Sequence, residues 1–368
     1  MTGGRTRLSR RARRVCIVWA VGWVVAMLAG ALLVDRVDVR FPYVADLARS
    51  YSAQRTPVVA ALGSSRTAGF FSTVRMNAYL ASVLPDRRLT TFNAAVAAGA
   101  LTIQEDVLKA LLPVGPKPAA LIIEVNIEWV HRRENWLVPR RDVTWNNVVE
   151  LAPDHWSRHG GRLLASRLLP IFDRRSELRQ AVWKWCHEQM DVNDPPHDPL
   201  LSGLVHSSPQ FMPTVPSVPV LSDHVREIQL QSAKQTARRL ADFSPTGSAV
   251  KALERMLSTC DAKGIPVVLV DPPICAPVRQ SFAVAESAYE AYLAGLLQRH
   301  PHARYYDARA VLPDHAFTDS HHVNDYGQYL MCRFLADEVL PDAFAAWSPT
   351  PSSDRVVGRR TASLDGLK

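Results

Sequence analysis

The sequence is poor in cysteine and lacks any CxxC pair. Its five cysteines are widely spaced along the chain, at Cys16, Cys186, Cys260, Cys275 and Cys332. Zinc sites and disulfide-stapled folds depend on closely spaced, patterned cysteines, so neither is predicted from this spacing. We therefore expect no metal and no cofactor, while disulfide bonds and free buried thiols both stay open for these residues.

The net positive charge is small outside the N-terminus, although the formal net charge of the whole chain is +8. Residues 1–34 contain six arginines and no acidic residue, so the rest of the chain carries a net charge of only +2. A nucleic-acid-binding surface needs basic residues gathered in a stripe with interleaved aromatic residues. No such stripe remains after residue 34, and no nucleic-acid partner is predicted.

A long uncharged segment follows these arginines. Residues 15–34 contain twenty residues without a charge, and a helix of that length spans the roughly 30 Å hydrocarbon layer of a membrane. The positively charged flank, residues 1–14, stays cytoplasmic, which places everything after Asp35 outside the cytoplasm. This predicts a single-pass membrane protein with its main domain outside the cytoplasm.

Two alternatives to a retained anchor stay open. Ala29, Gly30 and Ala31 form a small-residue site of the type that signal peptidases cleave, so residues 15–34 also fit a signal sequence. A buried core helix is the second alternative, which the preceding arginines disfavour.

Short apolar runs alternate with helical patterns beyond residue 56. The runs are rich in Val, Ile, Leu and Ala, which is typical of strands buried on both faces of a parallel sheet. Alternating strands and helices predict an α/β fold, a three-layer sandwich with a central parallel sheet. The predicted strands are 57–62, 89–92, 119–125, 266–270 and 303–307, and the predicted helices include 73–84, 102–112, 248–263 and 328–339.

The predicted domain boundaries follow from where the alternation of strands and helices begins, is interrupted and ends. Residues 35–56 are predicted to be a connector with helical character, and residues 57–347 the main domain. Residues 129–244 interrupt the alternation and are predicted to be a large insertion, which includes an amphipathic helix at 223–242. The tail, residues 348–368, is polar and rich in Ser, Pro and Arg, and is predicted to be disordered.

A candidate nucleophile follows the first predicted strand. The sequence Gly63-Ser64-Ser65-Arg66 stands directly after it, where a sharp turn can expose a serine hydroxyl near backbone N–H groups. Taken alone this tetrapeptide is equally typical of a helix N-cap turn.

A stronger motif lies near the C-terminus. Asp319 and His322 are three residues apart in a predicted loop before a helix, so the carboxylate can bond one imidazole nitrogen while the other nitrogen faces a serine. His321 is the competing candidate for the base, and the DxxH spacing with the following Val-Asn-x-x-Gly favours His322. Ser65, Asp319 and His322 are thus the predicted catalytic triad.

The order of these blocks resembles that of the SGNH (GDSL-like) hydrolase and acyltransferase superfamily. The resemblance makes Ser65 the nucleophile, with Ser64 in the place of the usual aspartate. It implies an oxyanion hole formed by Ser65, by Gly99 after the second strand and by Asn126 at the end of the third. The third block departs from the usual GxND pattern, because Val125 and Ile127 flank the asparagine.

The resemblance also implies a function, an extracytoplasmic serine esterase or O-acyltransferase. With its anchor, the chain resembles membrane-tethered proteins that assist membrane-bound O-acyltransferases. This resemblance implies a bacterial inner membrane with the main domain in the periplasm, an envelope or exported polysaccharide as substrate, and such an acyltransferase as partner. Three classes stay open: an O-acyltransferase, a simple anchored esterase or lipase, and a non-catalytic assembly partner. Six tryptophans could stack on sugars or form the insertion's core: Trp129, Trp136, Trp145, Trp156, Trp183 and Trp185.

Overall fold

The structure is a computed structural model, and it divides the chain into two compact units. One consists of residues 1–42 and 138–199, and the other of residues 43–137 and 200–368. The sheet, its helices and the candidate site all belong to the second unit. The residues that the structure describes are 14–15, 17–19, 21–26, 29, 42–55, 57–97, 99–131 and 215–347.

Five parallel strands form one sheet in the order β2-β1-β3-β4-β5. Every residue of the β1, β3 and β4 strands is buried, as their continuous apolar sequences require. The parallel sheet is confirmed, and each predicted strand is present within one residue of its predicted ends. The strands are β1 (Val58–Leu62), β2 (Thr90–Asn93), β3 (Ala120–Glu124), β4 (Val267–Asp271) and β5 (Ala303–Asp307).

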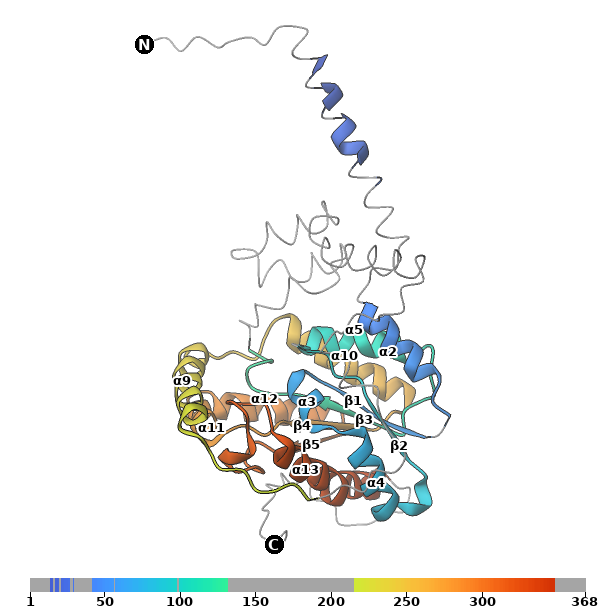
Figure 1. Ribbon diagram of the computed structural model, residues 1–368. Helices are drawn as coiled ribbons and strands as arrows, with labels where there is room; N and C mark the ends of the chain where they lie inside the picture. Colours follow the sequence, from blue (N-terminus) through green and yellow to red (C-terminus); the bar gives the residue numbers. More distant parts are fainter. Residues whose placement is uncertain are drawn as a thin grey trace, which may run out of the picture. The chain divides into compact units, whose positions relative to one another are not determined.

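Helices cover both faces of this sheet, which confirms the three layers (Figure 1). Helices α5 (Leu101–Leu111) and α10 (Ser248–Lys263) lie on one face, and α4 (Thr73–Val83) and α13 (Asp325–Phe334) lie on the other. Gly264 ends α10 with a φ of 58°, in the left-handed region where a side chain is disfavoured. The remaining described helices are α2 (Pro42–Ser52), α3 (Ser65–Phe70), α9 (Asp223–Leu240), α11 (Ala276–Gln280), α12 (Glu286–Arg299) and α14 (Leu340–Trp347).

The C-terminal helical region differs from the prediction of a single helix over 328–339. Its first helix, α13, begins earlier because the Asn324 side chain accepts the N–H of Gly327 at 3.0 Å and caps it. The chain then passes through a π-helical turn, Leu335–Val339, into α14. Pro341, the second residue of α14, has no N–H to donate back into this π-helical turn.

The ends of the predicted insertion lie beside each other. His131 and Pro245 form an isolated antiparallel bridge, and the backbone N–H of Ser244 donates to Nδ1 of His131 at 3.2 Å. Residues 132–214, with five of the six clustered tryptophans, lie outside the described residues. Helix α9, which follows them, packs against α11.

The structure describes only part of the predicted membrane anchor, residues 15–34. No helix among the described residues is long and apolar enough to cross a membrane. Several positions of the predicted anchor, all of residues 1–13, Cys16, Cys186 and the tail 348–368 lie outside the described residues. Among the described residues, Cys260, Cys275 and Cys332 are buried and form no disulfide bond.

Candidate active site

Ser65 is the first residue of α3, in a tight turn that directly follows β1. Ser64 caps the helix, because its Oγ accepts the N–H of Arg66 at 3.1 Å. Gly63 has to be glycine, since a Cβ there would lie 2.1 Å from Oγ1 of Thr67 and 2.7 Å from Oε2 of Glu124. The strand and the turn therefore fix the position from which the Ser65 side chain projects.

Three side chains from opposite ends of the domain form one hydrogen-bonded chain. Oγ of Ser65 lies 2.8 Å from Nε2 of His322, and Nδ1 of His322 lies 2.7 Å from Oδ2 of Asp319. Because a carboxylate only accepts, Nδ1 carries the proton and Nε2 is left as the acceptor for the serine hydroxyl. The structure thus brings together the three residues of the predicted triad, in the geometry of a nucleophile with its base and orienting acid.

Asp319 is held by its own loop. Its Oδ1 accepts the backbone N–H groups of His321 and His322, each at 2.8 Å. Burial alone would raise the pKa of this carboxyl, but the hydrogen bonds from the His322 ring and from these two N–H groups lower it below its ordinary range. From α9, Nε2 of Gln229 donates to the Asp319 carbonyl at 3.2 Å. Asp319 is therefore ionised and fixed in orientation.

His321, the alternative base, lies beside the triad without contacting Ser65. Its Nδ1 is 2.8 Å from Oγ of Ser320, and its ring centroid is 4.2 Å from that of His322. Burial, the Arg66 guanidinium and His322 together lower the pKa of His321 to about 3. It is consequently a neutral neighbour of the reacting groups, and His322 is the histidine that reaches the serine.

The two other predicted oxyanion groups are engaged elsewhere in the structure. The N–H of Gly99 donates to the Val96 carbonyl at 2.7 Å, closing a turn. A Cβ on Gly99 would lie 2.5 Å from the Gly63 carbonyl oxygen, so this glycine permits the loop after β2 to approach the nucleophile turn. In this geometry Gly99 supports the turn, and its N–H is not a spare donor.

Asn126 is buried at the end of β3, as predicted, but both ends of its amide have partners. Its Nδ2 lies 3.3 Å from Oε1 of Glu124, and its Oδ1 accepts the backbone N–H of Trp129 at 2.9 Å. The N–H of Ser65 itself, at the first position of a helix, has no partner within the described part of the chain.

Sequence reasoning missed two groups of charged residues around the nucleophile turn. Glu124 lies buried beneath the turn, and its position as the single acidic residue ending an apolar strand is the signal that could have identified it. Arg66 pairs with Glu128 at 2.6 Å, and Glu128 pairs in turn with Arg239 of α9 at 2.8 Å. These contacts connect α3 to α9 across the turn that follows β3.

One group of metal-ligating side chains coincides with the triad. In the described ranges, Asp319, His321 and His322 offer ligand atoms that all lie within 4.8 Å of one another. Asp319 and His322 already bond each other, so an ion there would compete with the hydrogen bond that orients the base. The arrangement therefore suits proton transfer, and a metal ion would act against it.

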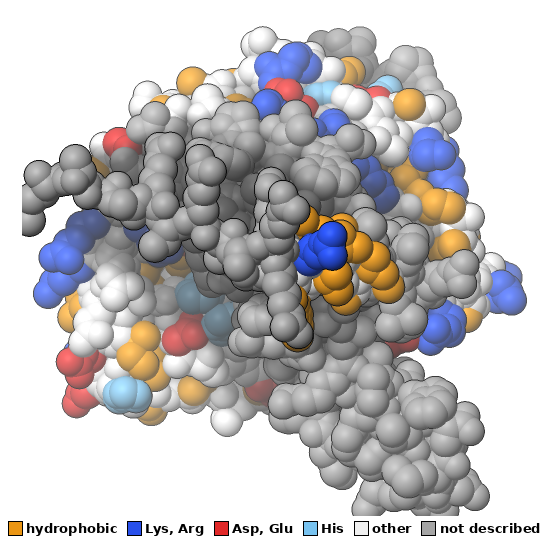
Figure 2. All heavy atoms as spheres, turned by 90° about the horizontal axis from the view of Figure 1, so that it is seen from above, with side chains coloured by type: hydrophobic (Ala, Val, Ile, Leu, Met, Phe, Trp, Pro, Cys, Tyr) orange, Lys and Arg blue, Asp and Glu red, His pale blue; other side chains and the backbone are white. Residues whose placement is uncertain are grey.

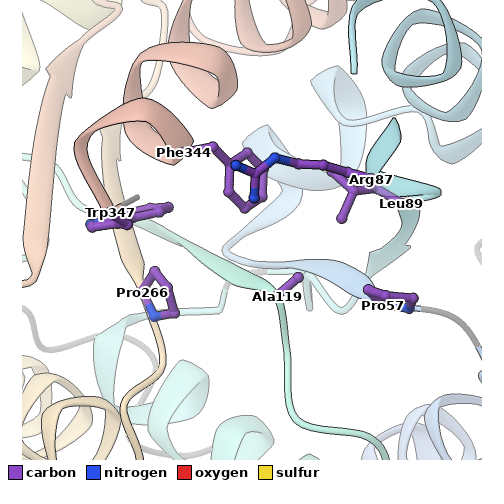
Figure 3. Close-up of a pocket in the computed structure, with 7 residues that line it drawn as sticks. All are labelled: Pro57, Arg87, Leu89, Ala119, Pro266, Phe344 and Trp347. Atoms are coloured by element: carbon purple, nitrogen blue, oxygen red, sulfur yellow. The ribbon is translucent and has the colours of Figure 1, made fainter. Parts of the chain in front are cut away.

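A hollow of about 410 Å³, whose lining residues Figure 3 shows, includes none of the triad residues. Pro57, Ala119 and Pro266, which line it, directly precede β1, β3 and β4. Ser65 follows the other end of β1. Ligands of open α/β sheets bind at the carboxyl ends of the strands, which is where the triad is.

Comparisons with known proteins add little to this geometry. One protein-family model matches residues 225–343, less than half of the chain. No curated protein matches the sequence. Among solved structures the chain is similar to LAE5, an alpha/beta hydrolase enzyme from the metagenome of Lake Arreo, Spain, with 12% identity and a TM-score of 0.34 over 78% of this chain and 96% of that one. That likeness is too low to carry an inference, so function has to come from the site.

Proposed function

We propose that this chain is a serine acyl-transfer enzyme of the SGNH type, working on an envelope or exported polysaccharide. The observation that carries the proposal is the continuous hydrogen-bonded chain from Ser65 through His322 to Asp319, with distances of 2.8 and 2.7 Å. Nucleophilic acyl transfer requires a serine, a base whose acceptor nitrogen faces the serine hydroxyl, and an ionised carboxylate that bonds the other side of the base.

The first half-reaction follows from the protonation states. Nε2 of His322 takes the Ser65 hydroxyl proton as Oγ forms a bond to the carbonyl carbon of an ester. Asp319 stabilises the resulting imidazolium through the 2.7 Å hydrogen bond. The tetrahedral intermediate collapses to an acyl-serine, and His322 returns the proton to the departing alcohol.

The Ser65 N–H is the proposed first donor to the oxyanion, because the beginning of a helix leaves this group without an intrahelical partner. The Asn126 amide and the Gly99 N–H are proposed to join it when substrate binds. Each must first leave its present partner, Glu124 for the amide and Val96 for the N–H. The oxyanion hole of this chain is thus completed during binding.

The second half-reaction decides between esterase and transferase. Water on the acyl-serine gives hydrolysis, and a sugar hydroxyl activated by His322 gives O-acylation. We favour the transferase, because the order of the motifs and the N-terminal segment resemble membrane-tethered partners of membrane-bound O-acyltransferases. A simple anchored carboxylesterase shares the first half-reaction and is the alternative.

The proposed location is the periplasmic side of a bacterial inner membrane, anchored by residues 15–34. In support, the described apolar side chains of this segment are exposed, among them Ile17, Trp19 and Trp23 at 54%, 74% and 61%. Exposed apolar residues in such a run fit a lipid environment better than water. No nucleic-acid partner is proposed, and Figure 2 shows acidic, basic and apolar side chains intermixed on the described surface of one face.

The test is acetyl transfer from a nitrophenyl ester to oligosaccharide acceptors, with release of nitrophenol and acetylated sugar followed together. The transferase proposal expects acceptor sugars to divert acetyl groups from water, and Ser65→Ala to abolish both products. Hydrolysis that no acceptor diverts would identify the esterase. Glycan modification in cells that is unchanged by Ser65→Ala would remove the catalytic proposal and leave a non-catalytic assembly role.

A further inference from the structure

A single buried carboxylate lies beneath the nucleophile turn. Glu124, the last residue of β3, is 1% exposed. Its carboxylate accepts the backbone N–H of Ser64 at 2.7 Å, the Ser64 hydroxyl at 2.8 Å and the Thr67 hydroxyl at 2.7 Å. These three bonds hold Ser64, which directly precedes Ser65, and Thr67, which lies two residues after it.

The same carboxylate also holds the segment that follows β3. Its Oε1 accepts the indole N–H of Trp129 at 3.0 Å and lies 3.3 Å from Nδ2 of Asn126. Glu124 therefore joins two segments that are distant in sequence, the one that carries the nucleophile and the one that carries the proposed oxyanion amide.

An ionised carboxylate fits this place better than an amide. Every group that hydrogen-bonds to the Glu124 side chain is a donor, and a carboxylate accepts on both oxygens without needing an acceptor in return. Glutamine would direct an NH₂ group at one set of these donors and leave it unsatisfied in a buried site. Burial alone would lower the pKa of the nearby Arg66, but Glu128 and then Glu124 raise it, so a fixed cation accompanies the buried negative charge.

We propose that Glu124 is a positioning residue for acyl transfer. It fixes the Ser65 turn against His322 and holds Asn126 beside that turn until substrate displaces the amide. This inference rests on the proposed function, since it assumes that Ser65 is acylated. It does not make Glu124 a catalytic residue, because its contacts are with Ser64, Thr67, Trp129 and Asn126 rather than with the reacting atoms.

The experiment compares Glu124→Gln with Glu105→Gln in the full chain. Glu105 is an equally buried glutamate, whose carboxylate accepts two bonds from Arg255 at 2.7 Å and pairs with Lys109, away from the triad. Both variants lose a buried charged contact, so both should melt at a lower temperature. A loss of stability should thus appear in both variants, whereas a loss of reaction rate per folded molecule should appear only in Glu124→Gln.

The readouts are kcat and KM for a nitrophenyl ester and the rate of Ser65 labelling by a fluorophosphonate. The kcat and the labelling rate are expressed per folded molecule. For Glu124→Gln we expect kcat and the labelling rate to fall about 10- to 100-fold, as for a reacting group displaced by about 1 Å. KM should stay within about twofold, and the acid limb of the pH profile should not shift because the His322 and Asp319 pair is untouched. Glu105→Gln should keep wild-type rates per folded molecule.

A Glu124→Gln rate within about twofold of wild type, per folded molecule, would overturn the inference. If this variant does not fold, Thr67→Val and Trp129→Phe test the inference instead, since each removes one hydrogen-bond donor to the Glu124 carboxylate. Both should slow the labelling of Ser65 about 3- to 10-fold, which is the loss expected for one hydrogen bond of about 1 kcal/mol. Wild-type labelling rates in both would also overturn it. Failure of the proposed function is distinct, because then the wild-type chain itself is not labelled at Ser65.

Discussion

Replacing Asp319 by asparagine should remove most of the activity without removing the side chain. The two backbone N–H groups that Oδ1 accepts, each at 2.8 Å, will draw the carbonyl oxygen of the new amide. Its NH₂ group is then left facing Nδ1 of His322, where the carboxylate stood at 2.7 Å. Nδ1 must now accept, so the proton moves to Nε2 and the imidazole presents a donor to Ser65 instead of an acceptor.

The size of the effect follows from this change of tautomer. A base locked in the wrong tautomer while the geometry stays intact costs a factor of about 10⁴ in kcat in a comparable serine triad. At 1.36 kcal/mol for each tenfold change, that is about 5 kcal/mol of transition-state stabilisation. KM should change little, because Asp319 lies behind His322 and not against the substrate.

The assay is steady-state hydrolysis of a nitrophenyl ester by purified wild type and by Asp319→Asn. Asp337→Asn serves as the control, because Asp337 pairs with Arg333 on the surface of the C-terminal helices and should keep activity within about twofold. An Asp319→Asn enzyme within about tenfold of wild type would refute the assigned role of the carboxylate.

Three further predictions concern stability, the turn and metals. Burial raises the pKa of Asp271 to about 8, whereas an aspartate in the unfolded chain has a pKa of about 3.9. The contribution of Asp271 to the free energy of unfolding is therefore fully present below pH 4 and is lost as the pH rises toward 8. Asp271→Asn should flatten this pH dependence in urea titrations from pH 5 to 8. Gly63→Ala, which places a Cβ 2.1 Å from a threonine hydroxyl, should lower both the melting temperature and the rate of serine labelling, and unchanged values in both would contradict the described turn. Zinc should inhibit ester hydrolysis reversibly through Asp319, His321 and His322, with EDTA restoring the rate, and insensitivity to zinc would count against that cluster as a ligand set.

The strands β1, β3 and β4 were predictable because their sequences are almost continuous apolar runs, which are typical of strands buried on both faces of a parallel sheet. The run 303–307 was predicted with its observed ends. Helix α12 was missed because its apolar residues are spread around the helix and give little periodicity.

The triad residues could be selected from spacing because Asp319 and His322 lie within one loop, whose local geometry their separation restricts. The oxyanion groups could not be selected in this way. Whether the Gly99 N–H or the Asn126 amide is free depends on contacts with Val96 and Glu124, and the pairing of Asn126 with Glu124 is set by how the segment after β3 folds back. The role of Glu124 could not be predicted for the same reason, since two of its partners, Ser64 and Thr67, lie 60 and 57 positions earlier in the chain.

The central claim is that Ser65 is a nucleophile activated by His322. It is tested most directly by reacting the full chain with a fluorophosphonate and mapping the modified peptide by mass spectrometry. We predict a single adduct on Ser65 in the wild type and in Glu105→Gln, and loss of that adduct in His322→Ala. Labelling that persists at the same rate in His322→Ala, or that falls on another residue while Ser65 stays unmodified, would contradict the account.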